Sequence, residues 1–316
     1  MHVFTAVIFF AAGLVMIIKG GDIFVDAARA IAGITGIPKI IIGATIVSVA
    51  TTLPELLVSL LATAQGSPDF ASGNAIGSVS ANMGLILGVS LTAMPSPADR
   101  KSLLSKGLLM MASAAVLCIL SLDESLTARD SLLMLGMLSY FIYINIKSLK
   151  NQGCFGEERL LTSKKTKQRI VFRFALGAAA IAFGAHLLVE KGEALAHIMG
   201  IPGGIIGLTL VAVGTSLPEL ATTLSAIRKR ESALSVGNIL GANIIDLCLI
   251  LPACSFLSGG QLPVSRTIAL LDIPFAVLLM SIAIIPALIS GRFRRWQGVL
   301  MLILYGAYIA FSVHVS

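Results

Sequence analysis

Two short motifs place a proline and then a glutamate inside strongly apolar stretches of the chain. They are TTLPEL, from Thr51 to Leu56, and TSLPEL, from Thr215 to Leu220. A carboxylate in an apolar environment is costly unless it is paired, hydrogen-bonded or bound to a cation. Glu55 and Glu219 are therefore the first candidates for an ion-binding site.

Each glutamate has other oxygen atoms nearby in the sequence. A proline lacks a backbone N–H, so it leaves the carbonyl four residues earlier, that of Ala50 or Gly214, without its usual helical partner. Hydroxyl groups three and four residues before each glutamate share its helical face. Such hard oxygen ligands suit calcium, sodium or magnesium and do not suit soft metals. The candidate hydroxyl ligands are those of Thr51, Thr52, Thr215 and Ser216.

The apolar segment after each motif adds further polar candidates. GNAIGSVSANMG, which begins at Gly73, contains Ser78 and Asn82. GNILGANIIDLC, which begins at Gly237, contains Asp246 at the position equivalent to Asn82. The small residues in both segments allow helices to approach closely. We therefore add these three polar side chains to the candidate ligands.

Few of the 16 acidic residues lie in such surroundings. Only Glu55, Glu219, Asp246 and Asp272 fall inside apolar runs. Asp272 lies near the end of its run, beside Pro274, and has no acidic counterpart in the other half of the chain. We expect Asp272 to be structural and the other three to bind ions.

The composition is that of an integral membrane protein. Of the 316 residues, 56% are hydrophobic and 12% are charged, and the mean hydropathy is +0.94. A spanning helix needs about 20 mainly apolar residues. The sequence predicts an all-α integral membrane protein with ten transmembrane helices, near residues 3–20, 37–63, 71–94, 103–121, 130–149, 169–189, 201–227, 232–258, 267–290 and 297–314.

The basic residues are distributed unevenly between the loops. When the loops are assigned alternately to two sides, 20 of the 23 Lys and Arg residues fall on one side, and only Arg129, Lys191 and Arg266 fall on the other. Basic residues accumulate in cytoplasmic loops, so we expect a multi-pass protein of the plasma membrane with both termini extracellular. The net charge of +7 then reflects topology and contact with the lipid bilayer, and we expect no nucleic-acid partner.

The two halves of the chain repeat with a constant offset of 164 residues. Between residues 43–87 and 207–251, 17 of 45 positions are identical without a gap. We expect a first five-helix repeat at 1–150, a cytoplasmic connecting loop at 151–168 and a second five-helix repeat at 169–316. Five is an odd number, so the two units enter the membrane in opposite senses and form inverted repeats. Inverted repeats are typical of secondary transporters.

The two motif pairs resemble the paired alpha repeats of the cation/calcium antiporter superfamily, in particular its prokaryotic sodium/calcium exchanger type. The resemblance implies a secondary active antiporter in which sodium entering down its gradient drives calcium out by alternating access. It also implies that Glu55 and Glu219 are the central ligands of the transported calcium and sodium ions. The further ligands that it implies are the side chains of Thr51, Thr52, Ser78, Asn82, Thr215, Ser216 and Asp246, and the backbone carbonyls of Ser48 and Ala212.

Two other expectations follow from the resemblance. Ala242 occupies the position equivalent to Ser78, where a serine is common in the family, so one hydroxyl ligand is absent and the sodium stoichiometry stays open. The first and sixth spans are implied to be long, tilted and peripheral, and to slide against a compact central bundle.

Alternative functions are of three kinds. An enzyme is not expected, because the sequence has neither a GxSxG motif nor a Walker A motif. A proton/calcium antiporter or a potassium-involving exchanger of the same superfamily stays open, since buried carboxylates can also carry protons. Asn82 and the hydroxyl groups favour sodium. A channel is disfavoured by the inverted repeat. We expect no cofactor, no regulatory calcium domain and function as a monomer.

Overall fold

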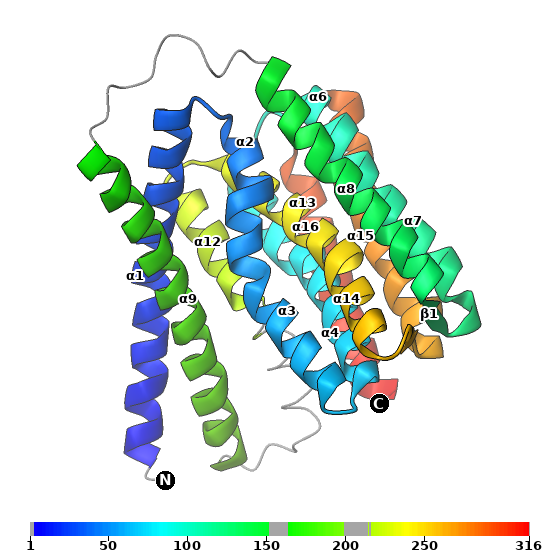
Figure 1. Cartoon of the computed structure of the whole chain (residues 1–316). Coiled ribbons are helices and arrows are strands. Elements are labelled where there is room, and N and C mark those ends of the chain that lie inside the picture. The colour runs from blue at the N-terminus through cyan, green and yellow to red at the C-terminus, as the bar shows by residue number, and fades with distance from the viewer. Residues whose placement is uncertain (1–2, 152–163, 199–213, 215, 316) are drawn as a thin grey trace.

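The computed structural model describes residues 3–151, 164–198, 214 and 216–315. In these parts of the chain almost every residue is helical, and the helices run side by side in an elongated bundle (Figure 1). Strands β1 (Ser125–Thr127) and β2 (Gln261–Pro263) pair antiparallel. The helices are α1 (Val3–Thr35), α2 (Lys39–Ile42), α3 (Ser48–Ala64), α4 (Pro68–Ala81), α5 (Gly88–Ala93), α6 (Arg100–Ser102), α7 (Leu108–Leu120), α8 (Ala128–Asn151), α9 (Lys164–Ile198), α12 (Leu217–Arg228), α13 (Ser232–Ile245), α14 (Leu251–Leu257), α15 (Ile273–Ser290) and α16 (Arg295–Val315).

Eight stretches of continuous helix in the described residues are long and apolar enough to cross a membrane. They correspond to eight of the ten apolar runs in the sequence. Of the other two runs, 201–227 lies largely outside the described residues, and 297–314 forms α16 without being among the eight. The total of ten spans therefore stays a prediction. The eight are Thr5–Thr35, Lys39–Ala64, Pro68–Ala93, Arg100–Asp123, Ala128–Ser148, Lys165–Leu187, Ser232–Leu257 and Ile268–Ser290.

Short π-helical turns interrupt several of these helices. Such turns are rare and are often found at functional sites. One begins at Asn82, directly after α4, and another begins at Asp246, directly after α13. Both ends of α4 are separated from the corresponding ends of α13 by 164 residues. The local structure of these two segments therefore repeats together with their sequence. The π-helical turns are Gly43–Val47, Asn82–Leu87, Leu103–Gly107, Asp246–Ile250 and Ile268–Asp272.

The two longest described helices, α1 and α9, pack against each other along one edge of the bundle (Figure 1). Glycines allow this close contact, since a Cβ atom on Gly177 would lie 2.7 Å from the backbone nitrogen of Phe24. The ring centroids of Phe24 and Phe174 are 4.4 Å apart. These helices supply most of a small hydrophobic cluster that is separate from the main core. The α1–α9 pair is thus the centre of a second hydrophobic cluster, which also includes residues of α2, α12 and α13.

The main core surrounds α13, which packs tightly against the continuous helix formed by α2, the π-helical turn and α3. Gly237 on α13 leaves no room for a Cβ atom beside the carbonyl oxygen of Ile40, and Gly43 leaves none beside that of Leu234. A small residue is required wherever two helix backbones come this close. The two halves of the chain therefore meet backbone to backbone beside the candidate site.

Candidate cation-binding site

The glutamates of the two motifs are enclosed within the bundle. Pro54 and Glu55 lie inside α3, whereas Pro218 and Glu219 lie in the first turn of α12. Glu55 is 1% exposed, Glu219 is 0% exposed, and Asp246 at the end of α13 is also 0% exposed. Burial of three acidic side chains in one apolar bundle requires polar partners or cations around them.

Hydrogen bonds connect the first motif to the second half of the chain. The Thr52 hydroxyl donates to Oε1 of Glu219 at 3.1 Å. Oγ1 of Thr51 lies 3.2 Å from Oδ1 of Asn238 and 3.3 Å from the carbonyl oxygen of Ser48. A hydroxyl has a single proton, so Thr51 donates to one of these oxygens at a time. Hydroxyl, carboxylate, amide and carbonyl oxygens thus gather between α3, α12 and α13.

A second group of polar contacts surrounds Asn82. Nδ2 of Asn82 donates to Oδ1 of Asn243 at 3.1 Å and lies 3.5 Å from Oδ2 of Asp246. On its other side, Nδ2 of Asn243 lies 3.5 Å from Sδ of Met110. Asn82 and Asp246 occupy equivalent positions in the two repeats, and here they are in direct contact. The structure therefore brings together the two segments that the sequence singled out.

Two equivalent asparagines fix the register of the motif helices. Nδ2 of Asn74 donates to Oγ of Ser59 at 3.0 Å, which holds α4 against α3. Nδ2 of Asn238 donates to Oγ1 of Thr222 at 3.2 Å, which holds α13 against α12. Both bonds lie about one helical turn from the motif glutamates. These two hydrogen bonds fix the axial position of each helix relative to its neighbour, and so determine which polar groups lie beside each glutamate.

This register determines what faces each glutamate on the neighbouring helix. One turn beyond the asparagines, Ser78 is level with Glu55, and Ala242 is level with Glu219. Both positions are buried. These two equivalent positions therefore differ by one hydroxyl group, which is present in Ser78 and absent in Ala242.

Several buried oxygen atoms of this region have no hydrogen-bond partner among the described residues. Such atoms are rare in folded proteins, and each costs about 1–3 kcal/mol when it is left unsatisfied. Their clustering on the predicted ligands is what a site for cations would produce, because a cation satisfies carboxylate, amide and hydroxyl oxygens together. The atoms are Oε1 and Oε2 of Glu55, Oε2 of Glu219, Oδ1 of Asp246, Oδ1 of Asn82 and Oγ of Ser216.

The acidic residues alone do not form a metal site. Among the described residues, no group of three or more His, Cys, Asp or Glu side chains is placed to hold one metal ion. The carboxylates are instead interleaved with neutral oxygen donors. Sodium and calcium accept such neutral oxygen donors, whereas zinc and the softer metals favour sites that include nitrogen or sulfur ligands.

The other predicted ligands fall into two groups. Ser48, Ser78 and Ser216 are buried beside the residues described above. The hydroxyl of Ser48 donates to the carbonyl of Thr45, while its own carbonyl lies near Thr51. Two remaining candidates, Thr215 and Ala212, lie outside the described residues.

Asn238 is not among the ligands predicted from the sequence. The dipeptide Gly237–Asn238 repeats Gly73–Asn74, and this repeat was a signal that both asparagines occupy equivalent positions. The structure places Asn238 between the first motif and α12. The same spacing between a motif glutamate and an asparagine occurs in both repeats of this chain, and this feature could have revealed the role of Asn238.

Outside the candidate site, Lys106 and Asp272 are two further charged residues in apolar segments. Lys106, which the sequence grouped with the polar loops, is 1% exposed within the candidate span Arg100–Asp123, and its Nζ has no hydrogen-bond partner among the described residues. Asp272 accepts a hydrogen bond from the Tyr308 hydroxyl at 2.8 Å. This contact agrees with the structural role expected for Asp272.

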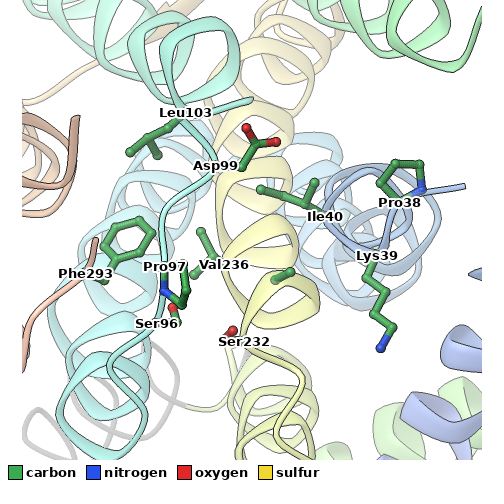
Figure 2. A pocket seen from close by; sticks show the side chains of 11 residues that line it. Pro38, Lys39, Ile40, Ser96, Pro97, Asp99, Leu103, Ser232, Val236 and Phe293 are labelled. Carbon is green, nitrogen blue, oxygen red and sulfur yellow. The ribbon is translucent and has the colours of Figure 1, made fainter. Parts of the chain in front are cut away.

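A cavity of about 210 Å³ lies away from these residues, between the start of α2, the segment after α5 and the start of α13 (Figure 2). Lys39, Asp99 and Ser232 provide polar groups in its wall, and Val236 and Phe293 provide apolar ones. None of the predicted ligands lines it. The cavity is therefore distinct from the candidate cation site.

Comparisons with known proteins bear on this geometry. A family model described as sodium/calcium exchanger protein matches residues 5–147 and 169–314. The sodium/calcium exchanger MaX1 of Methanosarcina acetivorans is 30% identical over 96% of this chain and 97% of its own length. A solved structure of the sodium-calcium exchanger NCX_Mj, soaked with sodium and strontium, is 29% identical, covers 98% of this chain and 99% of that one, and superposes with a TM-score of 0.84. The human sodium/potassium/calcium exchanger 1 is 30% identical over 48% of this chain, which corresponds to 14% of its own length.

Proposed function

The chain belongs to the sodium/calcium exchanger protein family, and from this premise we propose that it exchanges sodium for calcium across the membrane. Its relatives MaX1 and NCX_Mj carry this activity in their names and match almost the whole chain. As a member of this family, the chain is a membrane transporter and not an enzyme.

The proposed ion site lies where α3, α4, α12 and α13 meet. The observation that carries it is a set of buried oxygen atoms that have no hydrogen-bond partner in the described part of the chain, on Glu55, Glu219, Asp246, Asn82 and Ser216. Calcium uses the two glutamates as anionic ligands. Sodium, with half the charge, uses a larger share of neutral donors. The remaining proposed ligands are the side chains of Thr51, Thr52, Ser78 and Thr215 and the carbonyls of Ser48 and Ala212.

The ions compete because the same oxygens serve both. Filling the site with sodium neutralises the carboxylates that calcium requires, so the two ions cannot occupy it fully at the same time. We propose that the two inverted repeats present this site alternately to each side of the membrane. The shared bounds of α4 and α13 at an offset of 164 residues support this proposal. We place the protein in the plasma membrane, with both termini outside.

Potassium involvement and proton coupling are the competing functions. Similarity to a sodium/potassium/calcium exchanger over about half of this chain favours testing potassium directly. Against proton coupling, several candidate ligands are amides or hydroxyls, which do not exchange protons near neutral pH but do coordinate sodium.

Calcium uptake into proteoliposomes tests the proposal. Vesicles that contain the purified protein are loaded with sodium and diluted into sodium-free medium that contains calcium. Matched vesicles carry a potassium gradient or a pH gradient instead. We expect uptake with the sodium gradient alone. Uptake that requires potassium or follows only the pH gradient would replace sodium/calcium exchange with the corresponding alternative.

Variants then locate the activity. Glu55→Gln and Glu219→Gln each remove one anionic ligand at nearly constant volume, and we expect uptake to fall by more than about tenfold, since a lost charged ligand costs more than about 1.4 kcal/mol. Glu190→Gln is the matched control, because Glu190 is half exposed and pairs with its neighbour Lys191. Full activity in either site variant would exclude this site.

A further inference from the structure

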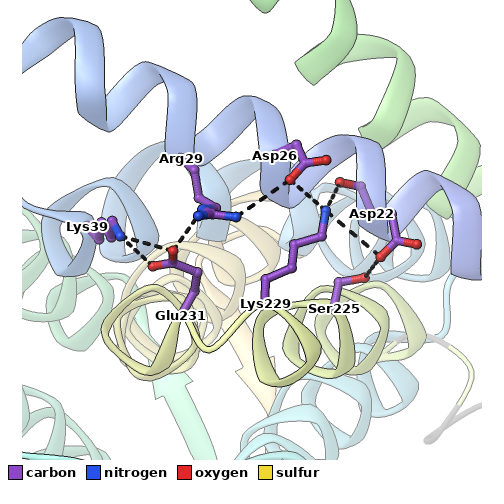
Figure 3. A network of polar contacts seen from close by, with 7 residues as sticks. All are labelled: Asp22, Asp26, Arg29, Lys39, Ser225, Lys229 and Glu231. Carbon is purple, nitrogen blue, oxygen red and sulfur yellow. Dashed lines mark hydrogen bonds and ion pairs between the residues drawn. The ribbon is translucent and has the colours of Figure 1, made fainter.

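A network of ion pairs fastens α1 to the turn between α12 and α13 (Figure 3). It consists of Asp22, Asp26 and Arg29 on α1, Lys39 at the start of α2, and Ser225, Arg228, Lys229 and Glu231 at the α12–α13 turn. We call it the α1 ion network. Among the described residues, every ion pair between different helices or turns belongs to this network.

Several contacts of the network are short, and Lys229 and Glu231 are its more buried charged side chains. Lys229 lies 2.7 Å from Asp26 and also donates to the backbone carbonyl of Asp22 at 2.5 Å. Glu231, which is only 6% exposed, lies 2.7 Å from Arg29 and 2.8 Å from Lys39. Partly buried charges in a network are screened less by salt than isolated surface pairs. The network is therefore a specific connection between α1 and the α12–α13 turn.

The network joins the α1–α9 pair to the rest of the bundle. α1 packs mainly with α9, and their small cluster also includes Ala221 of α12 and Leu234 of α13, whereas most buried apolar residues of α13 lie in the main core. Near the network, Gly21 allows α1 to approach the backbone of Ala221 on α12. A shift of the α1–α9 pair along the core would have to break these ion pairs first.

The repeat shows that this connection exists at one end of the molecule. Adding or subtracting 164 converts the charged turn Lys229–Glu231 into Gln65–Ser67, which has no charge. The same operation converts Asp22 and Asp26 into His186 and Glu190. Glu190 is half exposed and pairs with Lys191, its direct neighbour. Two repeats of identical sequence would make the two access states equal in energy, so a network that the described residues show at one end only makes them unequal.

We propose that the α1 ion network is a one-sided latch, which favours closure of the transport pathway at the end of the bundle where the network lies. The proposal rests on the proposed exchange function. The state that is open at this end must separate α1 from the α12–α13 turn, and the latch opposes that separation. Among the described residues, the opposite end has no ion pair between different elements, so we expect the resting protein to be open or occluded toward that side.

Charge exchange within one pair is the test. Lys229→Asp and Asp26→Lys each break the 2.7 Å pair, and the double variant Asp26→Lys/Lys229→Asp restores it with reversed polarity. In vesicles with one known orientation, the half-saturating calcium concentration is measured separately at each face. The apparent calcium affinity at a face is proportional to the fraction of protein that is open to it, so a larger open fraction lowers the half-saturating calcium concentration there.

We expect each single variant to lower the half-saturating calcium concentration at the network end and to raise it at the other end. The ratio of these two concentrations should change by about threefold to tenfold. The double variant should recover at least half of that shift. Lys19→Asp is the matched control for long-range charge effects. Lys19 is exposed and lies on α1 one turn before Asp22. An equal shift in this control, or purely additive effects in the double variant, would overturn the proposal.

A second measurement does not depend on transport. Spin labels at Ile18 on α1 and Leu224 on α12, both exposed apolar positions, report the separation of the two helices in a cysteine-free background. We expect Lys229→Asp to add a population at longer distance and the charge-exchange variant to remove it. Unchanged distances in Lys229→Asp would refute the latch even if exchange is intact. Loss of exchange in the unaltered protein would refute the proposed function and leave this measurement valid.

Discussion

Glu55 and Glu219 owe their chemistry to their neighbours. Each follows a proline and is almost fully buried, and Glu219 accepts a hydrogen bond from Thr52 in the other half of the chain. The motifs, and the ion chemistry that they favour, could be recognised from residue types and spacing alone. The bond from Thr52 to Glu219 could not, because it joins residues that are 167 positions apart.

Asn238 should contribute to ion affinity although it was not predicted as a ligand. It accepts from Thr51 and donates to Thr222, so it holds the first motif against α12 and α13. We expect Asn238→Ala to weaken apparent calcium affinity about fivefold to thirtyfold, which corresponds to loss of about 1–2 kcal/mol of hydrogen bonding. Equilibrium calcium binding to the purified protein measures this.

The control for this variant is Asn145→Ala on α8. Asn145 is also buried, and its Nδ2 donates to the carbonyl of Phe141 in its own helix. Its removal should change calcium affinity less than twofold. Equal effects of the two substitutions would show that any buried asparagine matters and would remove Asn238 from the site.

Lys106 is a charged residue near the start of the predicted span 103–121. Its side chain is buried without a hydrogen-bond partner in the described residues, although it was counted with the basic residues of one side of the membrane. Lys106→Met keeps most of the volume and removes the buried amine, so we expect stability to rise by about 1–3 kcal/mol. The midpoint of thermal unfolding in detergent should increase, and a decrease would reveal a partner that stabilises the lysine.

At the scale of elements, the contact of α13 with α2 and α3 sets the distance between the two halves. Gly237 has no space for a Cβ atom beside the carbonyl oxygen of Ile40, whereas a Cβ atom on the equivalent Gly73 would have its nearest neighbour at 3.9 Å. We therefore expect Gly237→Ala to destabilise the protein by about 2 kcal/mol or more, because two helix backbones must separate. Gly73→Ala should be neutral or stabilising by up to about 1 kcal/mol.

Paired unfolding measurements on these two variants check the expectation. A loss of stability that is the same in both would mean that both repeats pack alike at this position. The sequence could not distinguish them, because the two glycines stand in the same repeated Gly-Asn pair. Gly237 differs from Gly73 because α13 crosses α2, which lies almost 200 residues earlier in the chain, at Gly237.

At the scale of the whole molecule, the apolar runs predicted a helical membrane protein, and the described residues agree for eight of them. The composition of each run was sufficient here, since a span is defined by length and hydropathy. The separate packing of the α1–α9 pair could not be predicted from composition, because every helix in the bundle is similarly apolar. It follows from particular glycines, such as Gly177 and Gly184, that permit close contact.

The orientation of the protein in the membrane follows from its charges. With 20 of 23 basic residues assigned to one side, we expect both termini to face the opposite, external side. Protease should remove tags at either end from intact cells, while a tag inserted within residues 152–163 should be protected. Protection of the terminal tags, with cleavage of the internal one, would reverse the assigned orientation.

The most direct test of the central claim is competition between sodium and calcium for one site. Calcium binding to the purified protein is measured by calorimetry at increasing sodium, with Glu190→Gln as the control beside Glu55→Gln and Glu219→Gln. If the two ions share one site, sodium raises the apparent calcium dissociation constant in the unaltered protein and in the control. Both site variants then lose calcium binding. Calcium binding that is insensitive to sodium, or that survives in both site variants, would contradict a shared site.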